Sequence, residues 1–316
     1  MNGQFVVAIQ HLECLSRLGP GILLASGLRL TNDARRIDCL TRTEFRTSAG
    51  MLEVDYIAAA PLLAYTEIQD FAVPDGQTQI LLLLDIVNNF LNELWLYIEH
   101  TAFYDRGYLM ESRGVLHSHT QLSATYDHEG KRRLVKVTRK DLDQAKLSLR
   151  MARSEVVDDY SVRQDRLALG AHRTAANREI ELASRFSLFV QYARQTQDSA
   201  LRIAFICSAL EVLFSTGTSE LTHRVSERVA FLIGSDAPKR QALYGIVKRL
   251  YGVRSAFLHG DSIKKADQPN LTQMAREGDQ LLRVITVQIN TNPLFQNAIL
   301  EGKDALERFH TAQLFR

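Results

Sequence analysis

The sequence is poor in the residues on which small cross-linked or metal-bound folds depend. It has three cysteines, Cys14, Cys39 and Cys207, and no CxxC pair. An odd, scattered set of thiols argues against a disulfide framework and against a structural zinc site. We therefore expect three reduced cysteines. A phosphate-binding glycine-rich loop, a GxSxG elbow and an HExxH motif are also missing from the sequence.

Net charge and long apolar runs are also scarce. The 38 basic and 36 acidic residues leave a formal charge of +2, so any contact with nucleic acid would have to come from a local patch. The start, MNGQFVVAIQHLECL, lacks the residue order of a signal peptide, and apolar runs such as residues 80–84 are far shorter than a bilayer span. These absences predict a cytoplasmic protein that contacts no membrane.

What is present divides into two halves of different character. Residues 5–9, 21–30 and 51–57 resemble strands, whereas residues 77–100 repeat apolar side chains at spacings of three and four, which predicts an amphipathic helix on a sheet. Residues 114–137, with DHEG at 127–130, predict a hairpin. We therefore expect an α+β N-terminal domain over 1–165, with a role in sensing or recognition.

From about residue 166 to residue 316 the pattern predicts only helices. Their expected bounds are 172–197, 199–215, 219–234, 237–259, 268–291 and 294–311. Thr218 and Ser219 can cap one helix, Asp236 followed by Pro238 opens another, and Gly260 closes it. The second half is thus predicted to be an all-α domain, joined to the first by the polar run 154–164.

One helix end, RSAFLH at 254–259, carries a pair of residues that suits acid–base chemistry. A spacing of five residues separates Arg254 and His259 by about 7.5 Å along a helix and by about 140° around it. The two side chains therefore leave different faces, whereas Ser255 and His259 share one face. Read alone, the stretch is also an ordinary helix end, because a cation in the last turn and a following glycine both favour termination.

The surrounding sequence adds a family resemblance. The runs ALEVLF at 209–214, ELTHRVSERVAFLIG at 220–234 and LYGVRSAFLHG at 250–260 together resemble the HEPN superfamily, and within it the Apea-like HEPN domains. The likeness covers about residues 170 to 290. Three features of the family occur here in the family's order: the Leu-Glu pair at 210–211, a helix with an Arg-x3-Arg spacing and an Arg-x4-His ending. The resemblance therefore predicts an all-α HEPN-type bundle.

The resemblance implies a metal-independent endoribonuclease, of the kind used in phage defence or in toxin–antitoxin systems. In that family two copies meet so that the motif forms a shared site. His259 would then move protons during attack by an RNA 2′-hydroxyl, and Arg254 would hold the charged phosphorane. Ser255 would hydrogen-bond a phosphate or orient His259. The expected partners are RNA, a second copy of the chain, and an antitoxin or phage-derived trigger; no cofactor is expected.

Two further residues are assigned supporting roles next to this motif. Glu211 would fix Arg254 through a buried ion pair, or would serve a purely structural polar role. Tyr251 would stack on an RNA base, or would pack against a neighbouring helix.

Arg224 and Arg228 lie four residues apart and are predicted to form an RNA-binding ridge on one helical face. The alternative is that they pair with Glu220 and Glu227 as structural or solvated ions.

The first half offers two weaker signals. His117 and His119 alternate as on a strand and, with Asp127 and His128, suggest a metal site, although no third ligand is fixed by spacing and exposed strand histidines are common. KRRLVKVTRK at 131–140 has six basic residues in ten. That run is either an RNA-guiding surface or an edge strand that lysine and arginine protect from aggregation.

Two other functions remain open at the level of the sequence. The helical half could be a non-catalytic HEPN module that binds a protein or a nucleotide, with RSAFLH only structural. It could also be a toxin that a separate antitoxin, or the first half of the chain, holds inactive.

Overall fold

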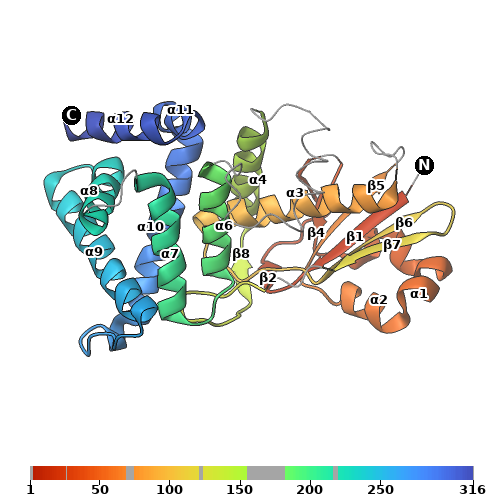
Figure 1. Cartoon of the computed structure of the whole chain (residues 1–316). Coiled ribbons are helices and arrows are strands. Elements are labelled where there is room, and N and C mark those ends of the chain that lie inside the picture. The colour runs from red at the N-terminus through yellow and green to blue at the C-terminus, as the bar shows by residue number, and fades with distance from the viewer. Residues whose placement is uncertain are drawn as a thin grey trace. The chain divides into compact units, whose positions relative to one another are not determined.

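The computed structural model describes residues 3–25, 27–68, 75–120, 124–154, 182–215 and 220–315. The chain forms two compact units (Figure 1). Residues 1–125 and 132–168 make the sheet unit, and residues 126–131 and 169–316 make the helical unit. A sheet-containing first part followed by helices agrees with the predicted order of classes. The predicted boundary near residue 165 lies outside the described residues.

The sheet unit is built on six antiparallel strands. Their order is β3 (Ile22–Leu23), β4 (Arg29–Thr31), β5 (Leu62–Ile68), β1 (Gly3–Ile9), β6 (Arg106–Glu111) and β7 (Leu116–Thr120). Strand β1 is central and buried on both faces, which is why its sequence reads as a continuous apolar run. Phe5 and Val7 enter one core while Val6 and Ala8 enter the other. The sequence predicts β1 but gave no separate signal for β5 or β6.

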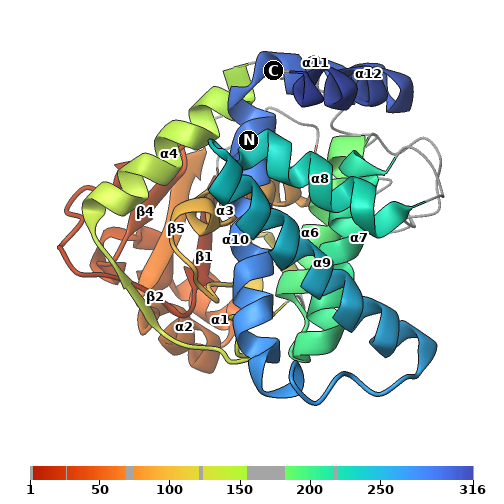
Figure 2. The ribbon, with the colours of Figure 1, turned by 90° about the vertical axis from the view of Figure 1, so that its left-hand side faces the viewer.

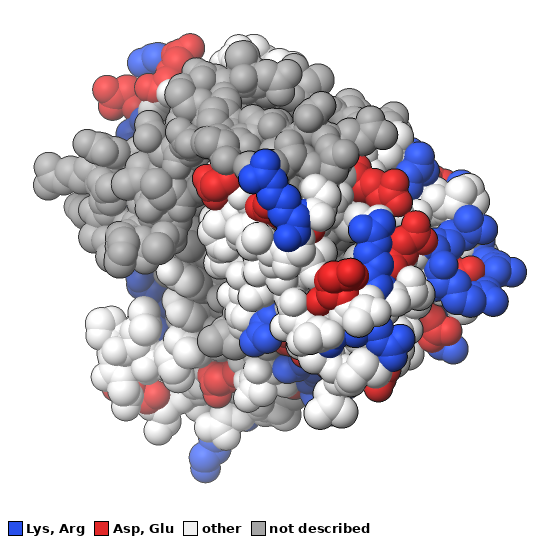
Figure 3. Space-filling model, turned by 90° about the vertical axis from the view of Figure 1, so that its right-hand side faces the viewer, with Lys and Arg blue, Asp and Glu red and all other residues white. Residues whose placement is uncertain are grey.

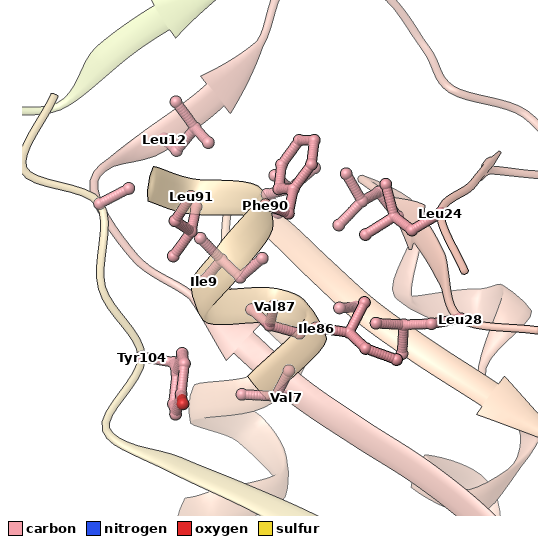
Figure 4. Packing of buried hydrophobic residues seen from close by; sticks show 14 of the residues in the cluster. Val7, Ile9, Leu12, Leu24, Leu28, Ile86, Val87, Phe90, Leu91 and Tyr104 are labelled. Atoms are coloured by element: carbon pink, nitrogen blue, oxygen red, sulfur yellow. The ribbon is translucent and has the colours of Figure 1, made fainter. Parts of the chain in front are cut away.

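One face of the sheet is covered by the long helix α3 (Gly76–Tyr97). The Asp75 side chain caps its start by accepting from the Thr78 N–H at 2.7 Å. Val87 and Phe90 of α3 lie over Val7 and Ile9 of β1 (Figure 4). By length and composition α3 is also apolar enough to cross a membrane, and half of its most apolar window is buried. The apolar face thus has a partner within the sheet unit.

The other face of the sheet is covered by short helices. These are the 3-10 turns η1 (Ala34–Arg36) and η2 (Asp38–Thr41), and the helices α1 (Thr43–Ala49) and α2 (Met51–Ala58). The predicted strand at 51–57 is therefore wrong. Val54 and Ile57, three residues apart, are buried while Leu52 is 87% exposed, which is helical rather than alternating spacing.

The predicted hairpin over 114–137 is also wrong. Strand β7 pairs with β6, whereas β8 (Val135–Val137) pairs in parallel with β2 (Leu12–Cys14). Residues 127–130 do form a turn, but the strand after it joins a separate two-stranded sheet. The sequence also missed helix α4 (Arg139–Ser154), which packs against α3.

The helical unit contains a central helix with helices around it. The described elements are α6 (Leu182–Arg194), α7 (Ser199–Phe214), α8 (Leu221–Ile233), α9 (Ala237–His259), η3 (Gln268–Asn270), α10 (Leu271–Thr291), α11 (Pro293–Glu301) and α12 (Lys303–Leu314). Helix α7 contacts α6, α8, α9 and α10, and most of its side chains are buried (Figure 2).

Several predicted helices match closely. The bounds of α9 are the predicted ones, and α7, α8 and α10 begin or end within a few residues of theirs. The predicted helix at 294–311 is two helices, because Gly302 has a φ of 99° and breaks the run between α11 and α12. The first part of the predicted helix 172–197 lies outside the described residues, as do Thr218 and Ser219.

Candidate functional site

Helix α9 positions the candidate site because both of its ends are fixed by local chemistry. At the start, the Asp236 side chain accepts from the Lys239 N–H at 2.9 Å, and Pro238 occupies the first turn. At the other end Gly260 has a φ of 74°, and the Asp261 N–H donates to the Ala256 carbonyl at 2.8 Å. His259 is therefore the last helical residue, as the sequence predicts.

The structure places the three residues of the proposed catalytic set on two sides of this helix end. Ser255 and His259 are exposed and lie one turn apart on the same face. Arg254 turns toward α7 instead, where its Nη2 lies 3.2 Å from Oε1 of Glu211. Within one chain, Arg254 and His259 thus lie on different faces of α9.

The predicted ion pair between Glu211 and Arg254 is present but is not fully buried. Their side chains are 24% and 26% exposed, although Oε1 of Glu211 and Nε of Arg254 are themselves buried. The pair joins α7 to α9 and holds the guanidinium in place. A positioned, solvent-accessible cation of this kind suits an anionic ligand better than a sealed salt bridge would.

Tyr251 packs between helices and does not stack on a ligand. It is 4% exposed, with the guanidinium carbon of Arg254 6.0 Å from the centre of its ring. Burial raises the pKa of Tyr251, and the nearby Cys207 and Glu211 raise it further. The base-stacking role is therefore wrong and the packing alternative holds. Cys207, near Tyr251, is also buried. Like Cys14 and Cys39 it is a free thiol, as predicted.

The predicted RNA-binding ridge of Arg224 and Arg228 does not form. Arg228 is 8% exposed, its Nη2 lies 2.6 Å from Oε2 of Glu307, and its Nη1 donates to the Phe214 carbonyl at 2.9 Å. Arg224 is partly exposed on the same helix. A guanidinium used twice inside the protein cannot also bind a phosphate on the surface, so only Arg224 remains for that role.

Arg228 belongs to a set of side chains that complete the end of α7. Three consecutive carbonyls there accept from other helices: Leu213 from Nε2 of His310 at 3.1 Å, Phe214 from Arg228, and Ser215 from Nζ of Lys303. The last carbonyls of a helix have no partner within it and carry partial negative charge, so cations and N–H donors stabilise them. Burial lowers the pKa of His310 to about 4.

The exposed side of α9 carries two glycines, Gly245 and Gly252, and two exposed cations, Lys248 and Arg249, beside the motif. A Cβ added at Gly252 would meet nothing within 4 Å, and at Gly245 only the Arg249 side chain would come near. Toward the helix end Phe257 is 37% and Leu258 54% exposed. This side of the helix therefore presents Ser255 and His259 next to two positions that have no side chain.

The metal interpretation of the first half has no support from the described residues. Among them, no group of three or more His, Cys, Asp or Glu side chains could hold a metal ion. Nε2 of His117 lies 2.7 Å from Oε1 of Glu111. The Asp127 carboxylate is used by the N–H groups of Glu129 and Lys131, at 2.9 and 2.8 Å.

The basic run 131–140 does not form one charged strand. Only residues 135–137 form a strand, β8, and several cations of the run have partners within the sheet unit. Lys136 lies 3.7 Å from Glu13, and the guanidinium of Arg132 lies 4.2 Å from the ring centre of Phe103. This supports the protected-edge interpretation over an RNA-guiding surface.

Another group of arginines in the sheet unit is partly neutralised. Arg17 and Arg35 both bind the Asp33 carboxylate, at 3.0 and 2.8 Å, and their hydrogen bonds lower the pKa of Asp33. Basic side chains gather at one side of the face in Figure 3, with acidic side chains among them. A patch with both signs of charge gives no strong attraction for a polyanion.

Comparisons with known proteins add no relative. No family model matches the chain, and neither a curated protein nor a solved structure matches it.

Proposed function

We propose that this chain is a metal-independent endoribonuclease of the HEPN type, cytoplasmic and acting in phage defence or a toxin system. One observation carries the proposal. The exposed pair Ser255 and His259 ends a glycine-capped helix, while Arg254 beside them is held by Glu211 of the neighbouring helix. The order of LEVLF, the α8 sequence and RSAFLH supports it independently of the geometry.

The chemistry needs only these side chains. The imidazole of His259 accepts the proton of the RNA 2′-hydroxyl while the 2′-oxygen attacks the phosphorus of the neighbouring phosphodiester. The bond from that phosphorus to the 5′-oxygen then breaks, and a proton is returned to the 5′-oxygen. The products are a 2′,3′-cyclic phosphate and a 5′-hydroxyl end. Arg254 stabilises the charge that develops on the phosphorus oxygens, and Ser255 hydrogen-bonds the phosphate or orients the imidazole.

A second copy of the chain would supply the catalytic side chain that one copy does not bring to the phosphate. Because Arg254 and His259 leave α9 on different sides, a single chain does not bring them onto one phosphate. An isologous dimer formed through the exposed face of α9 would bring His259 of one protomer toward the site of the other. The open space at Gly245 and Gly252 supports a close approach of two helices there.

The test is RNA cleavage by the purified full-length protein in EDTA. We expect His259→Ala and Arg254→Ala each to reduce cleavage by about a hundredfold or more, as loss of a proton-transfer group or an oxyanion donor does. His223→Ala is the matched control, because His223 is another exposed histidine of the helical unit. Unchanged cleavage in both variants, with melting temperatures retained, would exclude the assignment.

A second candidate function is a non-catalytic HEPN module that binds a protein or a nucleotide. The observation that favours it is the ion pair between Arg254 and Glu211, which gives Arg254 a structural use without any substrate. In that case Glu211→Gln and Arg254→Ala would lower stability, and purified protein would cleave no RNA. Loss of growth inhibition on expressing His259→Ala would instead support an active toxin, restrained by an antitoxin or by a phage-derived trigger.

A further inference from the structure

The turn that joins β1 to β2 in the sheet unit holds a histidine in a strained backbone conformation. His11 has a φ of 60°, and in the part of the chain that the structure describes Glu220 is the other non-glycine residue with a positive φ. A side chain with a Cβ is disfavoured in this left-handed region, so glycine would fit the turn better. Strain of this kind is found most often where a side chain serves a function. The imidazole of His11 is therefore kept at a cost to the backbone.

One nitrogen of the His11 ring is fixed by a hydrogen bond, and the other is open. Nδ1 lies 3.3 Å from Oγ1 of Thr101. That hydroxyl already donates its proton to the Arg133 carbonyl at 3.0 Å, so it accepts from His11, and Nδ1 carries the ring proton. Nε2 is then an acceptor, and it bonds to none of the described residues. Burial lowers the pKa of His11, and the charge of Arg132 lowers it further, which favours the neutral ring.

Beside His11, an arginine lies on an aromatic ring. The guanidinium carbon of Arg132 lies over the Phe103 ring, 4.2 Å from its centre. The His11 ring meets the same ring edge-on, with the ring centres 5.1 Å apart. Arg132 is exposed, and no carboxylate of the described residues pairs with it. One side of the guanidinium thus rests on Phe103, while the opposite side is open to a planar ligand.

A carboxylate on the same loop as Phe103 is held in place from one side. The hydroxyl of Tyr56, on α2, donates to Oδ2 of Asp105 at 2.6 Å. Burial and this hydrogen bond raise the pKa of Tyr56 to about 12, so the phenol keeps its proton. Oδ1 of Asp105 accepts from no residue that the structure describes. The charge of Asp105 also acts on the pKa of His11, so this open oxygen belongs to a carboxylate near the imidazole.

We propose that His11, Asp105 and Arg132 form a binding site for a guanine base that carries a phosphate. The base stacks on the open side of the Arg132 guanidinium, as bases do on arginine planes in RNA-binding proteins. Its N1–H and its 2-amino group, which are neighbouring donors on one edge, face the two acceptors, Oδ1 of Asp105 and Nε2 of His11. The charge of Arg132 also attracts the phosphate.

The pattern of acceptors is what selects guanine over the other bases. Adenine and cytosine each offer one amino donor, and uracil offers one ring N–H, so each would leave an acceptor of the site unpaired. A guanine base reaches the site either in a free nucleotide or within single-stranded RNA, and the same contacts recognise it in both. The site does not depend on ribonuclease activity, because it shares no residue with the candidate catalytic set.

The first measurement is calorimetric titration of the purified full-length protein with guanosine 5′-monophosphate. We expect saturable binding, and about tenfold weaker binding of inosine 5′-monophosphate, which lacks the 2-amino group. Adenosine 5′-monophosphate should bind at least as weakly as the inosine nucleotide. No binding of the guanine nucleotide at about 1 mM, or equal binding of inorganic phosphate, would overturn the proposal.

A second titration tells the two sources of the base apart. The ligand is a short single-stranded RNA with one guanine, and the protein is His259→Ala, so that the RNA stays intact. Tighter binding of this RNA than of guanosine 5′-monophosphate would assign the site to RNA, and equal or weaker binding would assign it to the free nucleotide. An RNA of the same length without guanine should bind about tenfold more weakly in either case.

Substitutions of the two charged residues test the contacts. Arg132→Gln removes the cation over Phe103, and Asp105→Asn removes the charged acceptor, so each should weaken binding of guanosine 5′-monophosphate about tenfold or more. Arg42→Gln is the matched control, because Arg42 is another exposed arginine of the sheet unit, and it should bind as the wild type does. Unchanged binding in both Arg132→Gln and Asp105→Asn would refute the site.

Two substitutions at His11 separate the role of its side chain from that of its backbone. His11→Gly and His11→Ala both remove the imidazole, so both should weaken binding about tenfold. Glycine adopts a φ of 60° without strain and alanine does not, so His11→Gly should melt at the higher temperature of the two. Wild-type affinity in both variants would remove His11 from the site. None of these measurements follows RNA cleavage, so this proposal and the ribonuclease proposal can fail separately.

Discussion

Acidification should destabilise the helical unit through one histidine. His310 is 2% exposed, and its Nε2 lies 3.1 Å from the Leu213 carbonyl. A carbonyl only accepts, so Nε2 carries the proton, and Nδ1 has no hydrogen-bond partner among the described residues. Protonation would place a charge at that buried Nδ1, which is why burial lowers the pKa of His310 from 6.5 to about 4.

The size and direction of this loss of stability follow from the difference in proton binding between the folded and unfolded chains. Below pH 6.5 the unfolded chain binds a proton that the folded chain refuses until about pH 4. The stability contributed by neutral His310 is therefore complete above pH 6.5 and is lost as the pH falls toward 4. A shift of about 2.5 units corresponds to about 3 kcal/mol of unfolding free energy over that window.

The assay is urea unfolding at about pH 7.5 and about pH 4.5, where most of the loss should have occurred. His310→Gln keeps an N–H donor for the Leu213 carbonyl but cannot titrate, so it should be less sensitive to pH by about 2 to 3 kcal/mol than the wild type. Equal slopes in the wild type and His310→Gln would refute the reasoning.

Three further predictions concern stability and assembly. Arg202→Met should cost about 3–5 kcal/mol of unfolding free energy, because it removes the guanidinium that binds the buried Asp279 carboxylate, and adding Asp279→Leu should recover part of that loss in urea titrations. Burial raises the pKa of Glu93 to about 7, so its stabilising neutral form is lost as the pH rises through 7. Glu93→Gln should therefore raise the thermal midpoint above pH 7 and change little below pH 4.5. Gly252→Ala should stabilise the folded chain by about 1 kcal/mol as a helix substitution in open space, yet weaken the proposed dimer in sedimentation; dimerisation that does not change would exclude this face as the interface.

The sequence predicted well those features whose causes are local. Helix α9 has its predicted bounds because Asp236 and Gly260 act within one turn of it. The Glu211–Arg254 pair was inferred from the family resemblance and is present, whereas its partial exposure depends on packing that no short motif records.

Features with distant causes were missed. Arg228 binds Glu307, which lies 79 positions away in the chain, so its spacing from Arg224 gave no hint of a buried role. Residues 51–57 look like a strand until the sheet above them is known, because the pattern alone does not say which side chains are covered. The hairpin prediction failed because β8 pairs with β2, more than a hundred residues earlier.

The completed end of α7 sets an order of events during synthesis. The Leu213 carbonyl accepts a hydrogen bond from His310, which is translated 97 residues later. At a ribosomal rate of roughly 5–20 residues per second this delay is about 5 to 20 seconds. Over that interval the Leu213 carbonyl, at the end of the central helix of the helical unit, lacks its donor from the chain, so the nascent chain is more open to proteases and to aggregation before α12 emerges.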